Sequence, residues 1–158
     1  MISPLETRPE PSNVPLARRL ITFAALLPLA AAAQPDPLKT AAAEAGAQVT
    51  PSGLVFRSLK DGSGPTPAAG DVVRVHYRGT FPDGKEFDSS FKRNQPAEFP
   101  LNRVIPCWTE GVQKIKVGGK AKLTCPAKIA YGERGTPGGP IPPNATLLFE
   151  VELIGIVK

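Results

Sequence analysis

The chain has few of the residues from which metal and redox sites are built. Its 158 residues include one histidine and two cysteines. The cysteines do not form a C-x-x-C motif, which excludes a thioredoxin-like redox role. The single histidine, His76, stands between two arginines in an alternating segment, so we expect it to face outward with no second ligand beside it. We therefore predict no metal site.

The chain also lacks a stripe of basic residues. Its formal net charge is +5, but the arginines and lysines are scattered singly between apolar positions. Proteins that bind nucleic acids gather such charges on one face or along one element. The pattern therefore favours a mildly basic surface and argues against a nucleic-acid partner.

No apolar run is long enough for a comfortable membrane span. The run over residues 20–33 follows two arginines, contains Pro28 and ends in alanines. This pattern is typical of a secretory signal peptide, for which we predict cleavage after Ala33. The alternative is an uncleaved N-terminal anchor. Cleavage would give an exported protein without a membrane segment, which we expect in the periplasm.

Residues 34–52 are predicted to form a flexible linker. They begin with two closely spaced prolines and continue into an alanine-rich stretch that ends near Gly46. Two helical turns of this kind are too short to be stable alone. We expect residues 53–158 to form the one folded domain.

After Gly53 the apolar residues recur with a period of two, as in half-buried strands. The alternation is clear at Val73, Val75 and Tyr77, and again over residues 147–153. Turn sequences rich in glycine and proline separate these segments. The sequence therefore predicts several antiparallel strands.

The period changes once, between residues 105 and 115. Trp108, Val112 and Ile115 are spaced as on one face of a helix, and two glycines follow. One short helix among many strands predicts an α+β fold, an antiparallel β half-barrel wrapped over that helix.

Aromatic residues make up only 6% of the chain, and several stand in short distinctive frames. In order, these frames are VHYRGTF with Tyr77, GKEFDSS with Phe87 and Asp88, VIPCWTEG with Trp108, IAYGERG with Tyr131, and LLFEVEL with Phe149. Their order and spacing over about residues 53–157 resemble the FKBP-type peptidyl-prolyl isomerases. The resemblance implies the same half-barrel fold.

The resemblance also implies an apolar pocket that holds a prolyl ring. Trp108 is expected to form its floor, and Asp88 to place its carboxylate near the carbonyl that rotates. The Tyr131 hydroxyl and the Ile105 backbone N–H are expected to donate to substrate carbonyls. The other walls and the rim are expected to comprise Tyr77, Phe87, Phe149, Val104 and Ile141. Each aromatic taken singly is more typical of plain core, whereas the matching frames together favour a site.

Two neighbouring positions refine this expected pocket. A carboxylate directly after a wall aromatic is costly unless it is paired, and Arg93, at a matching family position, is its expected structural partner. Ala97 stands where relatives often place an aromatic wall, so we expect a wider pocket that binds macrolides such as rapamycin more weakly.

An isomerase of this kind needs no nucleophile, metal or cofactor. Rotation of the prolyl amide has a barrier of about 18–20 kcal/mol. The twisted transition state is less polar than the planar amide, so an apolar pocket favours it. An acceleration of about 10⁴ needs only some 5–6 kcal/mol of differential binding.

The leading hypothesis is an exported isomerase that assists folding of polypeptides containing X-Pro bonds. The alternative is a non-catalytic module or holdase chaperone that grips proline-containing segments. Relatives with chaperone activity often carry a domain inserted after the residue matching Tyr131, and here nine residues separate it from Ile141. This short loop favours the enzyme. A long helical dimerisation arm has no room before residue 53, so we expect a monomer.

The two cysteines are predicted to lie on facing elements. Cys125 shares a strand face with Ala121 and Leu123, and Cys107 lies at the start of the predicted helix. In an exported protein they form either one disulfide or two buried free thiols. The separation of their Cα atoms distinguishes these alternatives.

Overall fold

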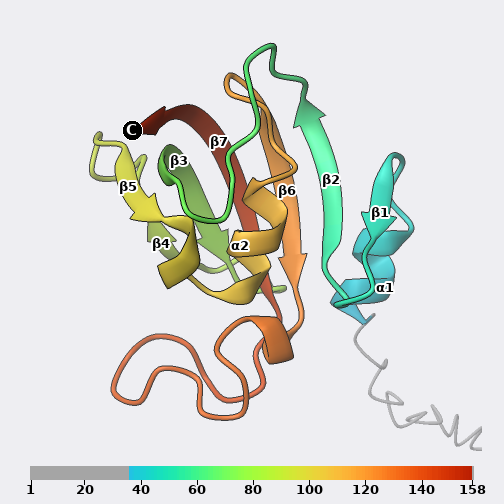
Figure 1. Cartoon of the computed structure of the whole chain (residues 1–158). Helices are drawn as coiled ribbons and strands as arrows, with labels where there is room; N and C mark the ends of the chain where they lie inside the picture. Colours follow the sequence, from blue (N-terminus) through green and yellow to red (C-terminus); the bar gives the residue numbers. More distant parts are fainter. Residues whose placement is uncertain (1–35, 158) are drawn as a thin grey trace, which may run out of the picture. The chain divides into compact units, whose positions relative to one another are not determined.

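The computed structural model describes residues 36–157, so the predicted signal peptide lies outside the described residues. Within this range the chain forms a sheet of seven strands with short helices (Figure 1). The elements in chain order are α1 (Pro37–Ala42), β1 (Ala47–Val49), β2 (Val55–Lys60), β3 (Val72–Thr80), β4 (Glu86–Ser89), β5 (Ala97–Pro100), η1 (Leu101–Arg103), α2 (Pro106–Val112), β6 (Lys120–Cys125), η2 (Ala127–Ile129) and β7 (Leu147–Val157).

The strands lie in the order β1-β2-β6-β7-β3-β4, and β5 pairs with β3 beside this path. Every pairing is antiparallel, as the sequence predicted. The long pair β3–β7 runs from Val72 opposite Val157 to Thr80 opposite Leu148 and forms the centre of the sheet. The β3–β4 turn contains Gly84 with a φ of 89°, a backbone conformation that glycine adopts without steric cost.

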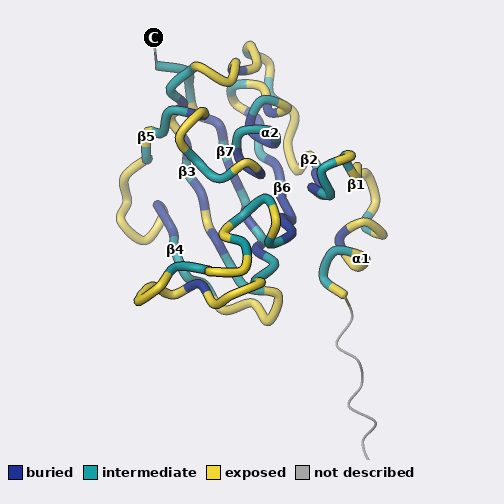
Figure 2. Tube along the Cα trace, turned by 60° about the horizontal axis from the view of Figure 1, so that its bottom comes forward, coloured by how far each residue is buried: buried dark blue, intermediate teal, exposed yellow. Residues whose placement is uncertain are grey.

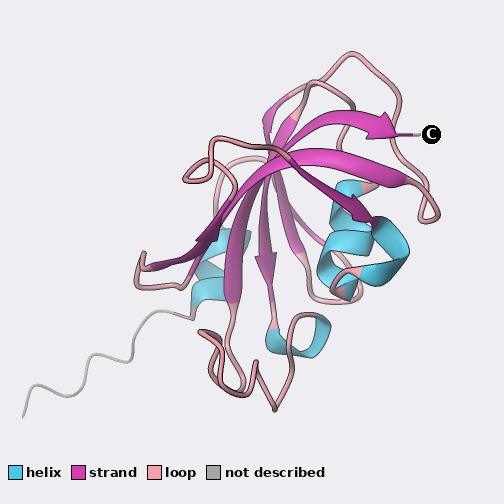
Figure 3. Ribbon diagram, turned by 90° about the vertical axis from the view of Figure 1, so that its left-hand side faces the viewer, coloured by secondary structure: helices cyan, strands magenta, loops and turns pink. Residues whose placement is uncertain are grey.

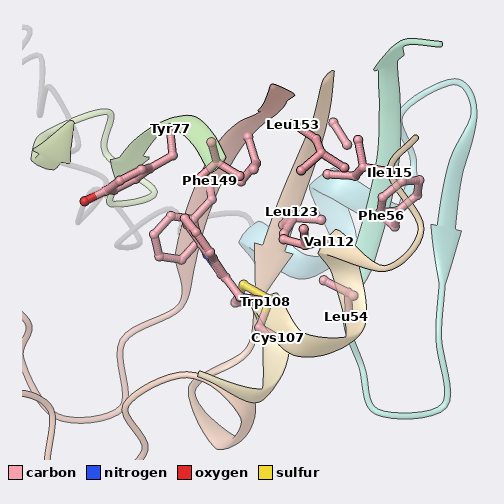
Figure 4. Packing of buried hydrophobic residues seen from close by; sticks show 14 of the residues in the cluster. Leu54, Phe56, Tyr77, Cys107, Trp108, Val112, Ile115, Leu123, Phe149 and Leu153 are labelled. Carbon is pink, nitrogen blue, oxygen red and sulfur yellow. A yellow bond between two sulfur atoms is a disulfide. The ribbon is translucent and has the colours of Figure 1, made fainter. Parts of the chain in front are cut away.

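The hydrophobic core lies between one face of the sheet and α2. Phe56, Leu123 and Phe149 are opposite one another in successive strands, so their side chains share that face. All three are buried, and α2 adds Trp108 and Val112 to the same cluster. Figure 2 shows the buried residues concentrated in the central strands and α2, and Figure 4 shows their side chains in contact.

Helix α2 ends at Val112, three residues before the end of the predicted helical face. The backbone continues in tight turns in which the Ile115 N–H donates to the Val112 carbonyl, and Ile115 stays buried. None of the helices within residues 36–157 has the length and apolar content to cross a membrane.

The structure corrects the predicted flexible linker over residues 34–52 in the part that it describes. Strand β1 pairs with β2, and Glu44 bonds Arg57 at 2.9 Å and Lys122 at 2.7 Å. These two basic residues alternate with the core-facing positions, so α1 lies on the sheet face opposite α2 (Figure 3). Pairing with residues far along the chain orders a segment that is too short to fold alone.

A disulfide joins Cys107 of α2 to Cys125 at the end of β6, and their Cα atoms are 5.8 Å apart. The structure thus contains the bridged alternative. Because Trp108 follows Cys107 directly, the bridge fastens the start of α2 to the sheet beside that indole (Figure 4).

Candidate active site

A cavity of about 350 Å³ opens at the N-terminal end of α2. Strands β3, β4, β5 and β7 contribute to it, together with the segment before α2 and the residues after η2. Its lining is mostly aromatic and aliphatic, with two charged side chains. The full lining comprises Tyr77, Phe87, Asp88, Phe99, Arg103, Val104, Ile105, Trp108, Tyr131 and Phe149.

Trp108 is the hub of the aromatic packing. Its ring centroid lies 5.1 Å from that of Tyr77, 5.6 Å from Phe99 and 5.3 Å from Phe149, with interplanar angles between 82° and 89°. Such edge-to-face pairs are the arrangement that ring quadrupoles favour. The indole Nε1 is buried and has no hydrogen-bond partner among the described residues. The cavity floor is thus rigid and apolar, with one unused donor.

Among the described residues, Asp88 is the only carboxylate that lines the cavity. Its Oδ2 accepts a hydrogen bond from the Tyr77 hydroxyl at 2.5 Å, and its Oδ1 accepts from Arg93 at 2.8 Å and from the Ser89 backbone at 2.9 Å. Arg93 also donates to the Tyr77 hydroxyl at 3.0 Å. The three side chains form one network that fixes the carboxylate at the cavity edge.

This network sets the protonation states at neutral pH. Partial burial acts to raise the pKa of Asp88, but hydrogen bonds from Tyr77 and Arg93 outweigh it and hold that pKa below its ordinary value. Burial, together with the neighbouring Asp88, raises the pKa of Tyr77 and that of Tyr131. The site therefore holds one carboxylate and two phenols that remain hydrogen-bond donors.

Tyr131 and Ile105 lie where they can contact a bound ligand. The Tyr131 side chain lines the cavity and is 40% exposed, because it lies in the segment after η2. Ile105 precedes α2, and its carbonyl accepts the first helical hydrogen bonds. Its backbone N–H has no acceptor within residues 36–157 and is free to bind a carbonyl.

Ile141 is the one predicted pocket residue that does not line the cavity. It is buried in the core, where its backbone N–H donates to Thr136 Oγ1 and its carbonyl accepts from the Thr136 N–H. Its side chain thus anchors one end of the loop that follows Tyr131. Spacing along a loop did not reveal which way this side chain points.

Sequence reasoning missed Phe99 and Arg103, which both line the cavity. Phe99 lies 5.9 Å from Tyr77, ring to ring. It shares a strand face with Ala97, because residues two apart in a strand point the same way. Phe99 thus supplies an aromatic wall beside the position of Ala97, and the expected effect of Ala97 on the width of the pocket stays a prediction.

His76 lies outside the cavity, stacked on Phe91 with 4.7 Å between the ring centroids. Its Nδ1 is 2.9 Å from the hydroxyl of Ser90, which also accepts a hydrogen bond from the Tyr77 backbone. Ser90 thus fastens the start of the loop between Asp88 and Arg93. Residues 36–157 contain no group of three or more His, Cys, Asp or Glu side chains placed to hold a metal ion.

Comparison with known proteins gives matches across most of the described chain. A family model described as FKBP-type peptidyl-prolyl cis-trans isomerase matches residues 64–154. The chain is 55% identical over 113 residues to the FKBP-type peptidyl-prolyl cis-trans isomerase FkpA of Aeromonas hydrophila, a match that covers 72% of this chain and 41% of that protein. It is 50% identical over 115 residues to FkpA of Escherichia coli K12, covering 73% and 42%.

Two solved structures are also similar. The crystal structure of FkpA from Escherichia coli superposes with a TM-score of 0.72 and 48% identity, covering 75% of this chain and 55% of that one. A peptidyl-prolyl cis-trans isomerase from Pseudomonas syringae gives a TM-score of 0.71 and 38% identity, covering 77% and 89%. These likenesses confirm the predicted half-barrel. The chain spans about two fifths of the length of the two FkpA proteins.

Proposed function

This chain belongs to the family of FKBP-type peptidyl-prolyl cis-trans isomerases, and we propose that its aromatic cavity isomerises X-Pro bonds in unfolded or partly folded polypeptides. The observation that carries the proposal is the set of rings around Trp108, closed at one edge by the ionised Asp88. This arrangement offers an apolar seat for a prolyl ring with one fixed carboxylate beside it.

The cavity favours the twisted amide over the planar one. Loss of resonance at the transition state reduces the polarity of the C–N unit, so the apolar rings stabilise it more than the ground state. The Ile105 N–H and the Tyr131 hydroxyl hold flanking carbonyls, which orients the bond that rotates. The Asp88 carboxylate repels the oxygen of the rotating carbonyl in the planar state. An ionised carboxylate has no proton to donate, so it forms no hydrogen bond that would hold this oxygen back as the bond rotates. No covalent intermediate is formed.

The experiment that tests the proposal is the refolding of a protein limited by a slow prolyl step. Uncatalysed exchange takes about 10–100 s. The purified protein should accelerate this phase, and Asp88→Ala should accelerate it less. Asp83→Ala removes an exposed carboxylate from the β3–β4 turn, outside the cavity lining, and serves as the matched control. Binding to unfolded protein without acceleration would favour the non-catalytic holdase instead.

The same cavity binds macrolides of the rapamycin type, which should compete with the peptide. We also expect the protein to be active as a monomer. Inhibition of the refolding assay by rapamycin tests the first statement, and sedimentation equilibrium tests the second. Retained activity at saturating rapamycin would place the reaction outside this cavity.

The protein works in an oxidising compartment outside the cytoplasm, and we expect the periplasm. The Cys107–Cys125 disulfide supports this location, because such bridges persist where thiols are not kept reduced. The predicted signal peptide agrees with it. Cell fractionation tests the location, and a protein recovered reduced from the cytoplasm would contradict it.

A further inference from the structure

The structure contains a second hollow, a groove of about 460 Å³ at the opposite end of α2 from the isomerase cavity. Figure 4 shows Phe56 and Ile115 at one end of the core cluster, with Tyr77 and Trp108 at the other. Phe56, Ile115 and Ala121 are buried and form the apolar floor of the groove. None of its lining residues belongs to the isomerase cavity, so the groove is a separate surface.

The charge of this groove is strongly one-sided. Four lysines line it, namely Lys60, Lys114, Lys116 and Lys120, against one carboxylate, Asp61. Asp61 already accepts a hydrogen bond from Ser58 at 3.0 Å. Among residues 36–157, only Lys120 of these four has a carboxylate within 4.0 Å, at Glu150. Three of the four lysines therefore have no carboxylate within ion-pair distance in the described part of the chain, and the groove carries a net positive charge.

The groove has defined walls. Gly62 lies so close to the turn after α2 that an added Cβ would approach the Lys116 carbonyl at 2.5 Å and the Gly119 nitrogen at 2.6 Å. The two turns are thus in close backbone contact beside the groove. Both turns carry lysines that line the groove, Lys60 before the first and Lys116 in the second.

The groove also adjoins an open strand edge. Strand β1 pairs with β2 only as far as Arg57, whereas β2 continues to Lys60. Within the described residues, the backbone over residues 58–60 has β6 on one side and no strand on the other. An extended peptide can add to such an edge through main-chain hydrogen bonds.

From these observations we propose that this lysine groove binds an extended acidic polypeptide segment in which paired acidic residues are followed by paired apolar residues, so that both kinds of side chain reach the same face of the added strand. Carboxylates of the segment pair with the three free lysines, its apolar side chains lie over Phe56 and Ile115, and its backbone extends the edge of β2. The site requires no proline and is independent of the isomerase reaction.

A labelled peptide tests this proposal by fluorescence anisotropy. The probe is a proline-free peptide that repeats Glu-Glu-Val-Val, and the comparison peptide carries Gln in place of each Glu. The Glu peptide should bind about tenfold more tightly, and raising the salt from about 0.02 to 0.2 M should weaken it severalfold, because ions screen surface charges. Equal binding of the two peptides would overturn the proposal.

Charge reversal locates the site. Replacing Lys60, Lys114 and Lys116 together by Glu should weaken the Glu peptide at least tenfold. The matched control replaces Lys39, Lys85 and Lys128, three exposed lysines outside the groove, with the same change in net charge. If both triple variants bound the Glu peptide equally weakly, the peptide would not bind specifically at this groove and the proposal would be overturned. If the Glu variant fails to fold, as judged by circular dichroism, the corresponding Gln variant replaces it.

Two further outcomes keep this inference separate from the isomerase proposal. The groove variant should accelerate prolyl-limited refolding as well as the wild type, and Trp108→Ala should still bind the Glu peptide. Loss of peptide binding in Trp108→Ala with retained fold would assign the peptide to the isomerase cavity and overturn the groove. Tighter binding of duplex DNA or anionic vesicles than of the Glu peptide at equal salt would overturn the choice of partner.

Discussion

The Tyr77 hydroxyl donates a hydrogen bond to the Asp88 carboxylate over 2.5 Å, and this contact joins a wall of the aromatic cavity to its charged edge. Arg93 bonds to both groups, so neither side chain can turn without breaking two contacts. The floor aromatic, Trp108, packs edge-on against the Tyr77 ring at 5.1 Å. The position of the carboxylate is therefore tied to the packing of the core.

The roles of Asp88 and Arg93 should separate on mutation. Asp88→Ala removes the carboxylate that acts on the rotating carbonyl, so kcat/KM for a proline peptide should fall about tenfold or more, which corresponds to about 1.4 kcal/mol of transition-state stabilisation. Arg93→Ala leaves the carboxylate in place, held by Tyr77 and the Ser89 backbone, so its loss should be only a few-fold. A protease-coupled isomerase assay measures both. If kcat/KM fell further in Arg93→Ala than in Asp88→Ala, the guanidinium and not the carboxylate would act directly on the substrate.

The stability of the protein should decrease in acid. The folded-state pKa of Asp88 lies below its ordinary value, so its contribution is present at neutral pH and is lost as the pH falls below about 4. Glu44 behaves alike, because its hydrogen bond from Lys122 lowers its pKa against the effect of burial. Urea unfolding between pH 3 and pH 7 measures the slope. Asp88→Asn should make the free energy of unfolding depend less on pH. An unchanged pH dependence would show that Asp88 does not contribute to it.

The periodicity of neighbouring residues predicted most of the strands and most of the cavity. It did not predict features that depend on pairing between segments far apart in the sequence. Tyr77 and Phe149 were found because alternation gives the buried face of a strand directly. Phe99 was missed because β5 is only four residues long. The sheet face to which its side chain points follows from the pairing of β5 with β3, in which Phe99 lies opposite Val73. Strand β1 was missed for the same reason, since three residues carry no periodicity.

The disulfide should stabilise the fold. Cys107 and Cys125 are 18 residues apart, and closing a loop of this length is worth about 3 kcal/mol on the chain-entropy model. The double replacement of both cysteines by Ala should therefore lower the free energy of unfolding by a few kcal/mol, measured with urea. Dithiothreitol should destabilise the wild type alone. Equal sensitivity of both proteins to the reductant would contradict the assignment.

Gly79 should tolerate no side chain. A Cβ at this position would lie 2.5 Å from the Phe87 ring and 3.0 Å from the Phe149 ring, so two cavity aromatics would have to move. Gly79→Ala should cost about 1–3 kcal/mol of stability, as is typical of overpacking, and should lower kcat/KM. Gly70→Ala has open space around the added atom and is the control. Full activity in Gly79→Ala would show that the rings relax freely.

The charge of Arg103 should bias the choice of substrate. This residue lines the isomerase cavity and is exposed, and it has no carboxylate within 4.0 Å in the described part of the chain. Asp88 is ionised and paired with Arg93, whereas Arg103 has no such partner among the described residues. A Glu residue beside the proline should therefore be preferred over Lys. Exposed pairs are worth about 0.2–1 kcal/mol, so the preference should be about two- to fivefold in kcat/KM.

Reversing this charge tests the argument, because packing alone does not depend on its sign. Arg103→Glu should invert the order of two tetrapeptides that carry Glu or Lys before the proline, whereas Lys85→Glu, which lies outside the cavity, should preserve it. Salt of about 0.5 M should diminish the preference in the wild type, because the Debye length then falls to a few ångströms. A preference that survives both changes would have to arise from the shape of the cavity instead of its charge.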